Sequence, residues 1–446
     1  MPGRIMMDPS RYAGRNDIIR EAHQYLSNGR SLFITGRRGV GKSSLATQIR
    51  QLMSRSSESE ERFGIKGSSS SCVLNVMYRC DGTETLTDFA SRLLHSMERA
   101  SGYQSVGAGK TVNRLKFNLK VVSYERADET ATEAPHVISR FSELVIDWAR
   151  QVRSVEDAEV TFWIDEADLL IERVNVGVFL KVVLENASDA GLAPLRFVLT
   201  GLNRALDRLR QQHPSITRFL MPVEVPPMGP DELTELVDRA IDPTSVSFEP
   251  DVREALYLMS QGFPDPVHLL GYELFEAALG NVHNVATPKT FNEVLRKVST
   301  GIKKDELRSV EAKIPSTECE KLLYSAALFP REFCTALDLA NHLEWKEDRC
   351  RELCAQLCDL QFLEQDGRRG FRFADPLFKI YLTILEAQRD ANAKFESKRN
   401  ELTSRAQLHM QSNEKASGAF RADTDRELLR IILNNFKTTG RTGMWS

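Results

Sequence analysis

The chain has 446 residues, of which 41% are hydrophobic and 27% are charged, and its formal net charge is -3 at pH 7. This composition is typical of a globular protein with room for about three domains. No run approaches the roughly 18 apolar residues of a membrane helix and no apolar leader opens the chain, so we expect a cytoplasmic protein without membrane contact. The charge balance excludes a general affinity for nucleic acid and restricts any DNA contact to a local patch.

Strands and helices alternate through the first half of the chain. Short apolar runs predict buried strands at residues 31–35, 72–78, 160–164, 196–200 and 221–225. Amphipathic spacing predicts helices at residues 17–26, 43–53, 86–100, 137–153, 174–188 and 203–212. Alternation of this kind, with long crossovers, is typical of an α/β protein with a doubly wound parallel sheet.

Changes in this pattern predict the domain organisation. Residues 11–229 would form the α/β core, with a disordered loop rich in serine and glutamate at about 54–71 and an inserted hairpin at about 103–130. Residues 230–301 have a wholly helical pattern and would form a small second domain. We expect a third domain at residues 317–387 and a polar helical tail at residues 388–446.

One segment matches the phosphate-binding pattern G-x-x-x-x-G-K-[ST] in full, between a predicted strand and a predicted helix. It reads Gly36-Arg37-Arg38-Gly39-Val40-Gly41-Lys42-Ser43. Glycines let the backbone N–H groups point at phosphate oxygens, and the start of the helix adds the positive end of its dipole. We expect Lys42 to reach the β- and γ-phosphates of ATP, Ser43 to ligate Mg²⁺, and Ser44 to lie in the same site.

Two acidic residues follow the apolar strand VTFWI. Asp165 and Glu166 would lie at the carboxyl edge of the sheet, where ligands of open α/β sheets bind. This position suits Asp165 to the Mg²⁺ shell and Glu166 to the general base that activates water. Either acid alone could merely cap the next helix, but the preceding phosphate loop favours the catalytic interpretation.

A further polar group follows the strand RFVLT. Thr200 ends this strand and Asn203 lies three residues later, so either side chain could contact the γ-phosphate. A simple turn from strand to helix would use the same residues. Both remain candidates for the phosphate sensor.

These motifs together resemble the AAA+/STAND group of P-loop ATPases, and within it the archaeal ATPases and the origin-recognition ATPases. The resemblance rests on the order of GRRGVGKSS, FWIDEAD, FVLTGLN, HPSITRFL and SQGFPDP, with Gly14-Arg15 upstream, and it covers about residues 11–385. It implies a five-stranded core with the P-loop strand in the middle, a helical lid and a C-terminal winged-helix domain.

The resemblance also implies roles for individual residues. Gly14 and Arg15 fall where the family has a short Gly-Arg motif near the adenine. Arg218 falls where the family has an arginine finger, which reaches the γ-phosphate of the nucleotide bound to a neighbouring subunit. An ordinary surface arginine is the alternative for Arg218. Pro264 matches the G-x-P element that packs near the nucleotide in STAND ATPases. The sequence lacks the lid arginine of many AAA+ proteins, which favours a switch over rapid turnover.

The third domain has the sequence pattern of a winged helix. Helices are predicted at 318–343 and 346–361, a hairpin at 362–373, and a closing helix at 375–387. Arg368 and Arg369 at the hairpin tip would suit contacts to DNA phosphates. Because the recognition helix would mix acidic and basic residues, an intramolecular lid or a protein-docking domain is the alternative.

Two functions are compatible with these assignments. In the first, the chain is an ATP-hydrolysing switch that forms homo-oligomers through Arg218 and acts on a partner protein, in bacterial defence by analogy with STAND proteins. In the second, it is a DNA-binding AAA+ ATPase of the origin-recognition or transposition-regulator kind. A steep salt dependence of DNA affinity that requires Arg368 and Arg369 would favour the second.

Overall fold

The computed structural model describes residues 5–65, 72–102, 134–298, 309–329 and 333–386, apart from residues 157, 193, 282 and 368. Its contacts divide the chain into an N-terminal unit, Ile5–Pro226, and a C-terminal unit that begins at Pro227. No helix within these described ranges is long and apolar enough to cross a membrane. The hairpin predicted at 103–130 and the tail predicted at 388–446 lie outside the described residues.

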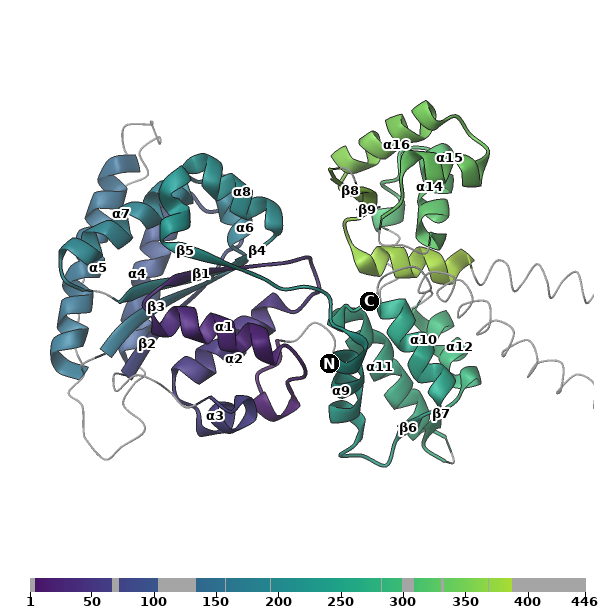
Figure 1. The fold of residues 1–446 in the computed structure, drawn as a ribbon, viewed down its shortest axis with the longest axis horizontal. Helices are drawn as coiled ribbons and strands as arrows, with labels where there is room; N and C mark the ends of the chain where they lie inside the picture. Colours follow the sequence, from purple (N-terminus) through teal and green to yellow (C-terminus); the bar gives the residue numbers. More distant parts are fainter. Residues whose placement is uncertain are drawn as a thin grey trace, which may run out of the picture. The chain divides into compact units, whose positions relative to one another are not determined.

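A five-stranded parallel sheet is the centre of the N-terminal unit (Figure 1). Its strands lie in the order β2-β3-β4-β1-β5, and each neighbouring pair is parallel. They are β1 (Ser31–Thr35), β2 (Cys72–Arg79), β3 (Ala158–Asp165), β4 (Leu195–Gly201) and β5 (Leu220–Glu224). The predicted α/β fold with five parallel strands is therefore confirmed. The P-loop strand β1 is not in the middle, however: β4 is central, and β1 lies between it and the edge strand β5.

Helices cover both faces of this sheet (Figure 1). On one side lie α1 (Asn16–Ser27), α2 (Lys42–Met53) and α3 (Ser57–Phe63). On the other side lie α4 (Leu86–Gly102), α5 (Ala134–Glu156), α6 (Ala167–Ile171), α7 (Val176–Asp189) and α8 (Asn203–Gln212). Two 3₁₀ turns, η1 (Pro9–Arg11) and η2 (Pro214–Arg218), complete the unit. Because the five strands are parallel, their carboxyl ends lie along the same edge of the sheet. This edge carries the site described below.

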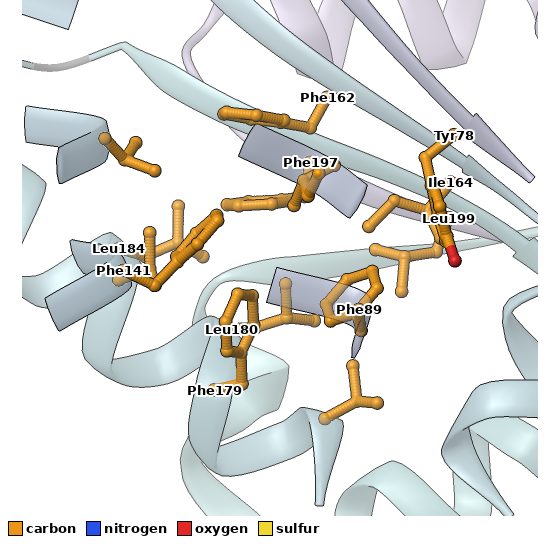
Figure 2. Close-up of a cluster of buried hydrophobic side chains, with 14 of the residues drawn as sticks. Tyr78, Phe89, Phe141, Phe162, Ile164, Phe179, Leu180, Leu184, Phe197 and Leu199 are labelled. Atoms are coloured by element: carbon orange, nitrogen blue, oxygen red, sulfur yellow. The ribbon is translucent and has the colours of Figure 1, made fainter. Parts of the chain in front are cut away.

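Aromatic side chains fill the space between the sheet and the helices α4, α5 and α7 (Figure 2). Phe162 of β3 stacks on Phe197 of β4 with 4.8 Å between ring centroids. Phe179 of α7 meets Phe141 of α5 at 4.8 Å and Phe89 of α4 at 5.2 Å. Such pairs contribute roughly 0.5–1.5 kcal/mol each beyond their burial. The cluster thus fixes β3 and β4, whose carboxyl ends carry functional residues, against the helices.

The stretch 54–71, expected to be a disordered loop, contains the helix α3. Glu58 and Glu60 in its first turn suit the positive end of the helix dipole. Gly64 ends it with φ 63°, a left-handed conformation that glycine adopts without strain. Phe63 is 2% exposed, and its ring meets that of Tyr12 edge-on at 6.1 Å. This tertiary contact, which the polar composition conceals, orders the segment; residues 66–71 lie outside the described ranges.

Within the described residues 227–298, the C-terminal unit is mainly helical. Its helices in this range are α9 (Pro230–Ile241), α10 (Pro250–Ser260), α11 (Pro264–Leu279) and α12 (Pro288–Lys297). Each begins with proline, whose missing N–H costs no hydrogen bond at the first helical position. The region is not wholly helical as predicted, because the two-residue strands β6 (Ser247–Phe248) and β7 (Val285–Ala286) pair in parallel between the helices.

Further helices and a hairpin occupy residues 309–386. The helices are α14 (Thr317–Leu328), α15 (Ala336–Leu343) and α16 (Glu347–Asp359), and residues 376–386 form a closing helix. The strands β8 (Leu363–Asp366) and β9 (Gly370–Phe373) form an antiparallel hairpin, and Cys334 adds an isolated bridge to Phe371.

The single helix predicted over 318–343 is two helices in the structure. The first ends before Phe329, which precedes a proline in the sequence, and the residue before a proline disfavours the helical conformation. Thr335 begins the second by accepting a hydrogen bond from the N–H of Asp338 at 3.1 Å. The predicted order of helices and hairpin is otherwise present, and the name winged helix stays a prediction.

Candidate functional site

Glycines shape the loop between β1 and α2. Gly39 and Gly41 have φ of 74° and 93°, in the left-handed region that favours glycine. Gly36 leaves no room for a side chain, because a Cβ there would lie 2.8 Å from the carbonyl oxygen of Val225 and 3.0 Å from Cγ1 of Val40. The loop therefore requires glycine at all three predicted positions. A substitution at any of them would change the path of the backbone.

Lys42 begins α2, and its side chain turns back over this loop. Its Nζ donates to the carbonyl oxygens of Gly36 at 3.0 Å and Arg37 at 2.9 Å. Burial lowers the pKa of Lys42 to about 8, while the carboxylates of Asp168 and Asp165 oppose the shift. Phosphate oxygens placed beside the ammonium would stabilise its charged form. The side chain thus lies over the loop, and its predicted contact with the β- and γ-phosphates stays a prediction.

Two hydroxyl groups from separate elements meet on one carboxylate oxygen, that of Asp165. Ser43 Oγ, in the first turn of α2, donates to Asp165 Oδ1 at 2.8 Å, and Thr200 Oγ1 of β4 donates to the same atom. Asn203 is exposed at the start of α8, so the structure brings only Thr200 of the two predicted sensors into this described cluster. Hydroxyl and carboxylate oxygens in such proximity are ligands that suit Mg²⁺, so these residues fit the predicted metal.

Glu166 points away from that cluster. Its backbone has φ 56° between β3 and α6, and its carboxylate accepts hydrogen bonds from Arg79 at 2.6 Å (Nη2 to Oε1) and 3.1 Å (Nε to Oε2). Arg79 ends β2, on the opposite side of β3 from the P-loop strand. Nothing in the sequence singled out Arg79, because only the pairing of β2 with β3 brings it opposite Asp165.

The segment before α1 lies along the P-loop helix. The N–H of Met6 donates to Ser44 Oγ at 3.1 Å. Gly14 has φ 66°, and Arg15, at φ 58°, donates through Nη2 to the carbonyl oxygen of Pro226 at 3.3 Å. Ser44 and Arg15 therefore hold chain segments beside the loop. Their predicted contacts with a nucleotide, like that of Gly14, stay predictions.

Arg218 lies far from the P-loop of its own chain. It is exposed at the end of η2, two residues before Leu220, which pairs with Ser31 at the start of β1. Gly36 follows the other end of β1, roughly 16 Å away along the strand. An arginine side chain is too short to span that distance. Its role as a finger for a neighbouring subunit stays a prediction.

The remaining predicted residues lie in the C-terminal unit. Pro264 is buried at the start of α11, and Gly262 has φ 84°, where a Cβ would lie 2.7 Å from the carbonyl oxygen of Met228. The G-x-P element thus packs on the start of this unit, and its contact with nucleotide stays a prediction. Arg369 lies at the hairpin tip with its guanidinium 5.9 Å from the ring of Phe333, whereas Arg368 lies outside the described residues.

In this parallel sheet, the glycine loop with Lys42 and Ser43 follows the carboxyl end of β1, and Asp165 ends β3 nearby. This arrangement defines a P-loop NTPase. The family model Novel STAND NTPase 1 (nSTAND1) matches residues 6–303. The chain therefore belongs to the nSTAND1 family, and the predicted resemblance to STAND ATPases is confirmed. No curated protein matches the chain.

The chain is also similar to solved structures of low sequence identity. A Walker-type ATPase of Pyrococcus abyssi is 18% identical with a TM-score of 0.52, over 85% of this chain and 98% of its own. The ORC1 protein of Aeropyrum pernix in complex with DNA is 14% identical, with a TM-score of 0.44 over 83% and 92%. The RuvB Holliday junction branch migration motor of Thermotoga maritima is 14% identical, with a TM-score of 0.39 over 82% and 94%. At 18% identity the first likeness shows the fold alone.

Proposed function

We propose that the protein is an ATP-binding and slowly ATP-hydrolysing switch that forms homo-oligomers and acts on a partner protein. The family supports nucleotide hydrolysis. The observation that carries the choice of a nucleoside triphosphate with Mg²⁺ is the shared oxygen of Asp165, on which the hydroxyls of Ser43 and Thr200 converge. A triphosphate bound on the loop would lie beside this cluster, next to Lys42.

Binding would use groups that the loop already orients. The backbone N–H groups of the glycine loop and the start of α2 attract phosphate oxygens, and Lys42 supplies a cation beside them. Ser43 and Asp165 would hold Mg²⁺, which neutralises charge on the β- and γ-phosphates. Adenine recognition by the segment around Gly14 and Arg15 is part of the proposal.

Hydrolysis would require Glu166 to change partner. In the reaction, the oxygen of a water forms a bond to the γ-phosphorus while the bond from that phosphorus to the bridging oxygen of ADP breaks. Glu166 would take the proton of that water and return it to the phosphate released. Because Arg79 occupies both of its carboxylate oxygens, Glu166 must leave Arg79 first. This requirement lowers the turnover rate only modestly, because an exposed ion pair is weak.

Assembly and partner binding are supported by charges on two surfaces. Arg218 is exposed and far from its own P-loop, which suits a role at a neighbouring subunit. In the C-terminal unit, Arg349 pairs with Glu318 and Arg351 pairs with Glu347. These pairs neutralise the two arginines of α16, which also carries four acidic residues, and this balance favours a protein partner over DNA. A role in bacterial defence is proposed only by analogy with STAND proteins.

A second candidate function is DNA binding by residues 309–386. The guanidinium groups of Arg369 and Arg372 both lie over the ring of Phe333, at 5.9 and 5.1 Å. Arg369 is exposed and can contact phosphates, whereas Arg372 is half-buried and pairs with Glu364. DNA affinity measured over a range of salt concentrations, with and without ATP, tests this candidate. A steep salt slope that Arg369→Ala reduces would favour DNA binding.

The main proposal is tested by comparing the parent with Lys42→Ala. The parent should bind ATP, hydrolyse it with Mg²⁺, and differ in assembly between ADP and a non-hydrolysable ATP analogue when imaged by electron microscopy. Lys42→Ala should lose nucleotide binding and that difference, because it removes the cation beside the phosphates. Lys181→Ala, which removes a lysine that pairs with Glu185 on α7, is the matched control and should equal the parent. Equal ATP affinity in parent and Lys42→Ala would reject the assigned site.

A further inference from the structure

The helix α3 is an element that the proposed function does not use. It follows the P-loop helix α2 and packs against η1, α1 and α2 (Figure 1). Arg62, in its last turn, donates twice to the carbonyl oxygen of Tyr12, from Nη2 at 3.0 Å and from Nε at 3.3 Å. Its Nη1 donates to Oδ1 of Asn16 at 3.4 Å. One guanidinium therefore holds both ends of the turn 12–16, which leads into α1.

The backbone of this turn is left-handed at two successive residues. Gly14 has φ 66° and Arg15 has φ 58°. A residue with a side chain adopts this conformation at a cost, so it persists only where surrounding contacts hold it. Besides the bonds from Arg62, the buried ring of Phe63 meets the ring of Tyr12 edge-on at 6.1 Å. The end of α3 thus supports the strained turn through both a hydrogen-bonding group and an aromatic ring.

The same turn borders the phosphate loop. Arg15 donates through Nη2 to the carbonyl oxygen of Pro226 at 3.3 Å. Val225 directly precedes Pro226, and its carbonyl oxygen is the atom that a Cβ on Gly36 would meet at 2.8 Å. A continuous series of contacts therefore joins Arg62, through the turn, to the first glycine of the loop.

The order of the strands indicates which end of a nucleotide this turn would meet. In the sheet, β1 lies between β4 and β5. The cluster on Asp165, proposed to hold Mg²⁺ beside the γ-phosphate, belongs to the side of β3 and β4. Val225 and Pro226 follow β5, on the other side of β1. Because the phosphates of a nucleotide form a linear chain, a γ-phosphate at the cluster would place the nucleoside on the side of the turn.

We propose that Arg62 is a positioning residue of the nucleotide site, which holds the turn 12–16 where it contacts the nucleoside of ATP. This inference rests on the proposed function. The planar guanidinium donates in several directions at once, which the single ammonium of a lysine cannot reproduce. Loss of Arg62 should weaken the binding of the nucleoside. It should leave the binding of the phosphates unchanged, because the glycine loop and Lys42 do not contact Arg62 in the described part of the chain.

Two probes separate this role from a general contribution of Arg62 to folding. A non-hydrolysable ATP analogue occupies the whole site, whereas inorganic tripolyphosphate occupies only the phosphate loop, and both are titrated with Mg²⁺. Arg62→Ala should bind the ATP analogue roughly tenfold more weakly, since hydrogen bonds from a charged group are lost, and should bind tripolyphosphate as the parent does. Arg62→Lys should lose less, because its ammonium can still reach the carbonyl oxygen of Tyr12. Arg140→Ala, which removes an exposed arginine paired with Glu143 on α5, is the matched control and should equal the parent.

An equal loss of affinity for the two probes would overturn the proposal, because it would indicate damage to the loop or to the fold. An unchanged affinity for the ATP analogue in Arg62→Ala would also overturn it. Should Arg62→Ala fail to fold, Arg62→Lys provides the same comparison. If the parent binds neither probe, the proposed function itself is wrong. If the parent binds both probes and hydrolyses ATP, but Arg62→Ala equals it throughout, only this inference fails.

A double-variant cycle with Arg15→Ala tests whether Arg62 acts through the turn. Arg15→Ala removes the bond from the turn to Pro226 without changing α3. If both arginines hold the same turn, the double variant should lose less affinity for the ATP analogue than the product of the two single losses. Single losses that multiply in full would show that Arg62 acts independently of the turn, and the proposal would be rejected.

Discussion

Arg79 donates two hydrogen bonds to Glu166, one to each carboxylate oxygen, from the strand on the opposite side of β3 from the P-loop. The side chains of Arg79 and Glu166 are 65% and 42% exposed, so solvent screens this ion pair. Such a pair is typically worth about 0.2–1 kcal/mol. The contact is therefore strong enough to bias the position of Glu166 and weak enough to open during each cycle.

Arg79→Ala should accelerate basal ATP hydrolysis by roughly 1.4- to fivefold, the rate equivalent of losing such a pair. Single-turnover rates with Mg²⁺ would measure the change. Arg20→Ala, which removes another exposed arginine from an ion pair with Asp17 on α1, is the matched control and should equal the parent. A slower Arg79 variant would show instead that Arg79 contributes to the reaction.

Glu166→Gln should preserve ATP binding and reduce hydrolysis by about 10²–10⁴-fold, since an amide cannot take a proton from water. Equilibrium binding of ATP and single-turnover hydrolysis, measured on the same protein, would separate the two effects. In this background Arg79→Ala should give no acceleration, because there is no base left to free. Unchanged turnover in Glu166→Gln would assign the base to another residue.

The fold was predictable because its signals are local. The apolar run 31–35 and the amphipathic run 203–212 have the bounds that the structure gives to β1 and α8. The proximity of Ser43 and Asp165 was predictable because each occupies a fixed place after a strand, and the sheet brings those places together.

Other features depend on contacts between residues that are distant in the sequence. Arg79 meets Glu166 only through the register of β2 on β3, 87 residues apart. The ordering of α3 depends on the contact of Phe63 with Tyr12, and composition alone predicted a loop. Arg62 has no motif of its own: its bonds to Tyr12, 50 residues away, follow from the packing of α3 on η1. Local patterns cannot reveal such pairings.

Thr200→Val should slow ATP hydrolysis by on the order of tenfold, because the loss of the hydroxyl misplaces the Asp165 carboxylate while the side chain keeps its shape. Thr200→Ser should restore most of the rate by returning the hydroxyl. Asn203→Ala, at an exposed position outside the cluster, should equal the parent. The rates of the three variants over a series of Mg²⁺ concentrations measure this difference. The opposite result, a normal Thr200→Val and an inactive Asn203→Ala, would make Asn203 the sensor.

Arg218→Ala should bind ATP normally yet lose hydrolysis and ATP-dependent assembly together, if Arg218 completes the site of a neighbouring subunit. The reason is geometric: Arg218 is exposed at the edge of the sheet opposite to its own P-loop. Binding, hydrolysis and sedimentation with ATP would be measured over a range of protein concentrations. Arg210→Ala, which removes an exposed arginine paired with Asp207 on α8, is the matched control.

Mixing Arg218→Ala with Lys42→Ala provides the decisive measurement. Each variant keeps the half of a shared site that the other lacks: Arg218→Ala has an intact P-loop, and Lys42→Ala has an intact Arg218. An equal mixture should therefore regain part of the parent hydrolysis. If the subunits combine at random, the gain is up to about a quarter of the parent rate, because about one neighbouring pair in four places an intact P-loop beside an intact Arg218. The role as a finger is rejected if the mixture stays inactive. It is also rejected if the parent rate per chain is independent of protein concentration and Arg218→Ala has the same rate. In either case Arg218 is an ordinary surface charge and the switch acts as a monomer.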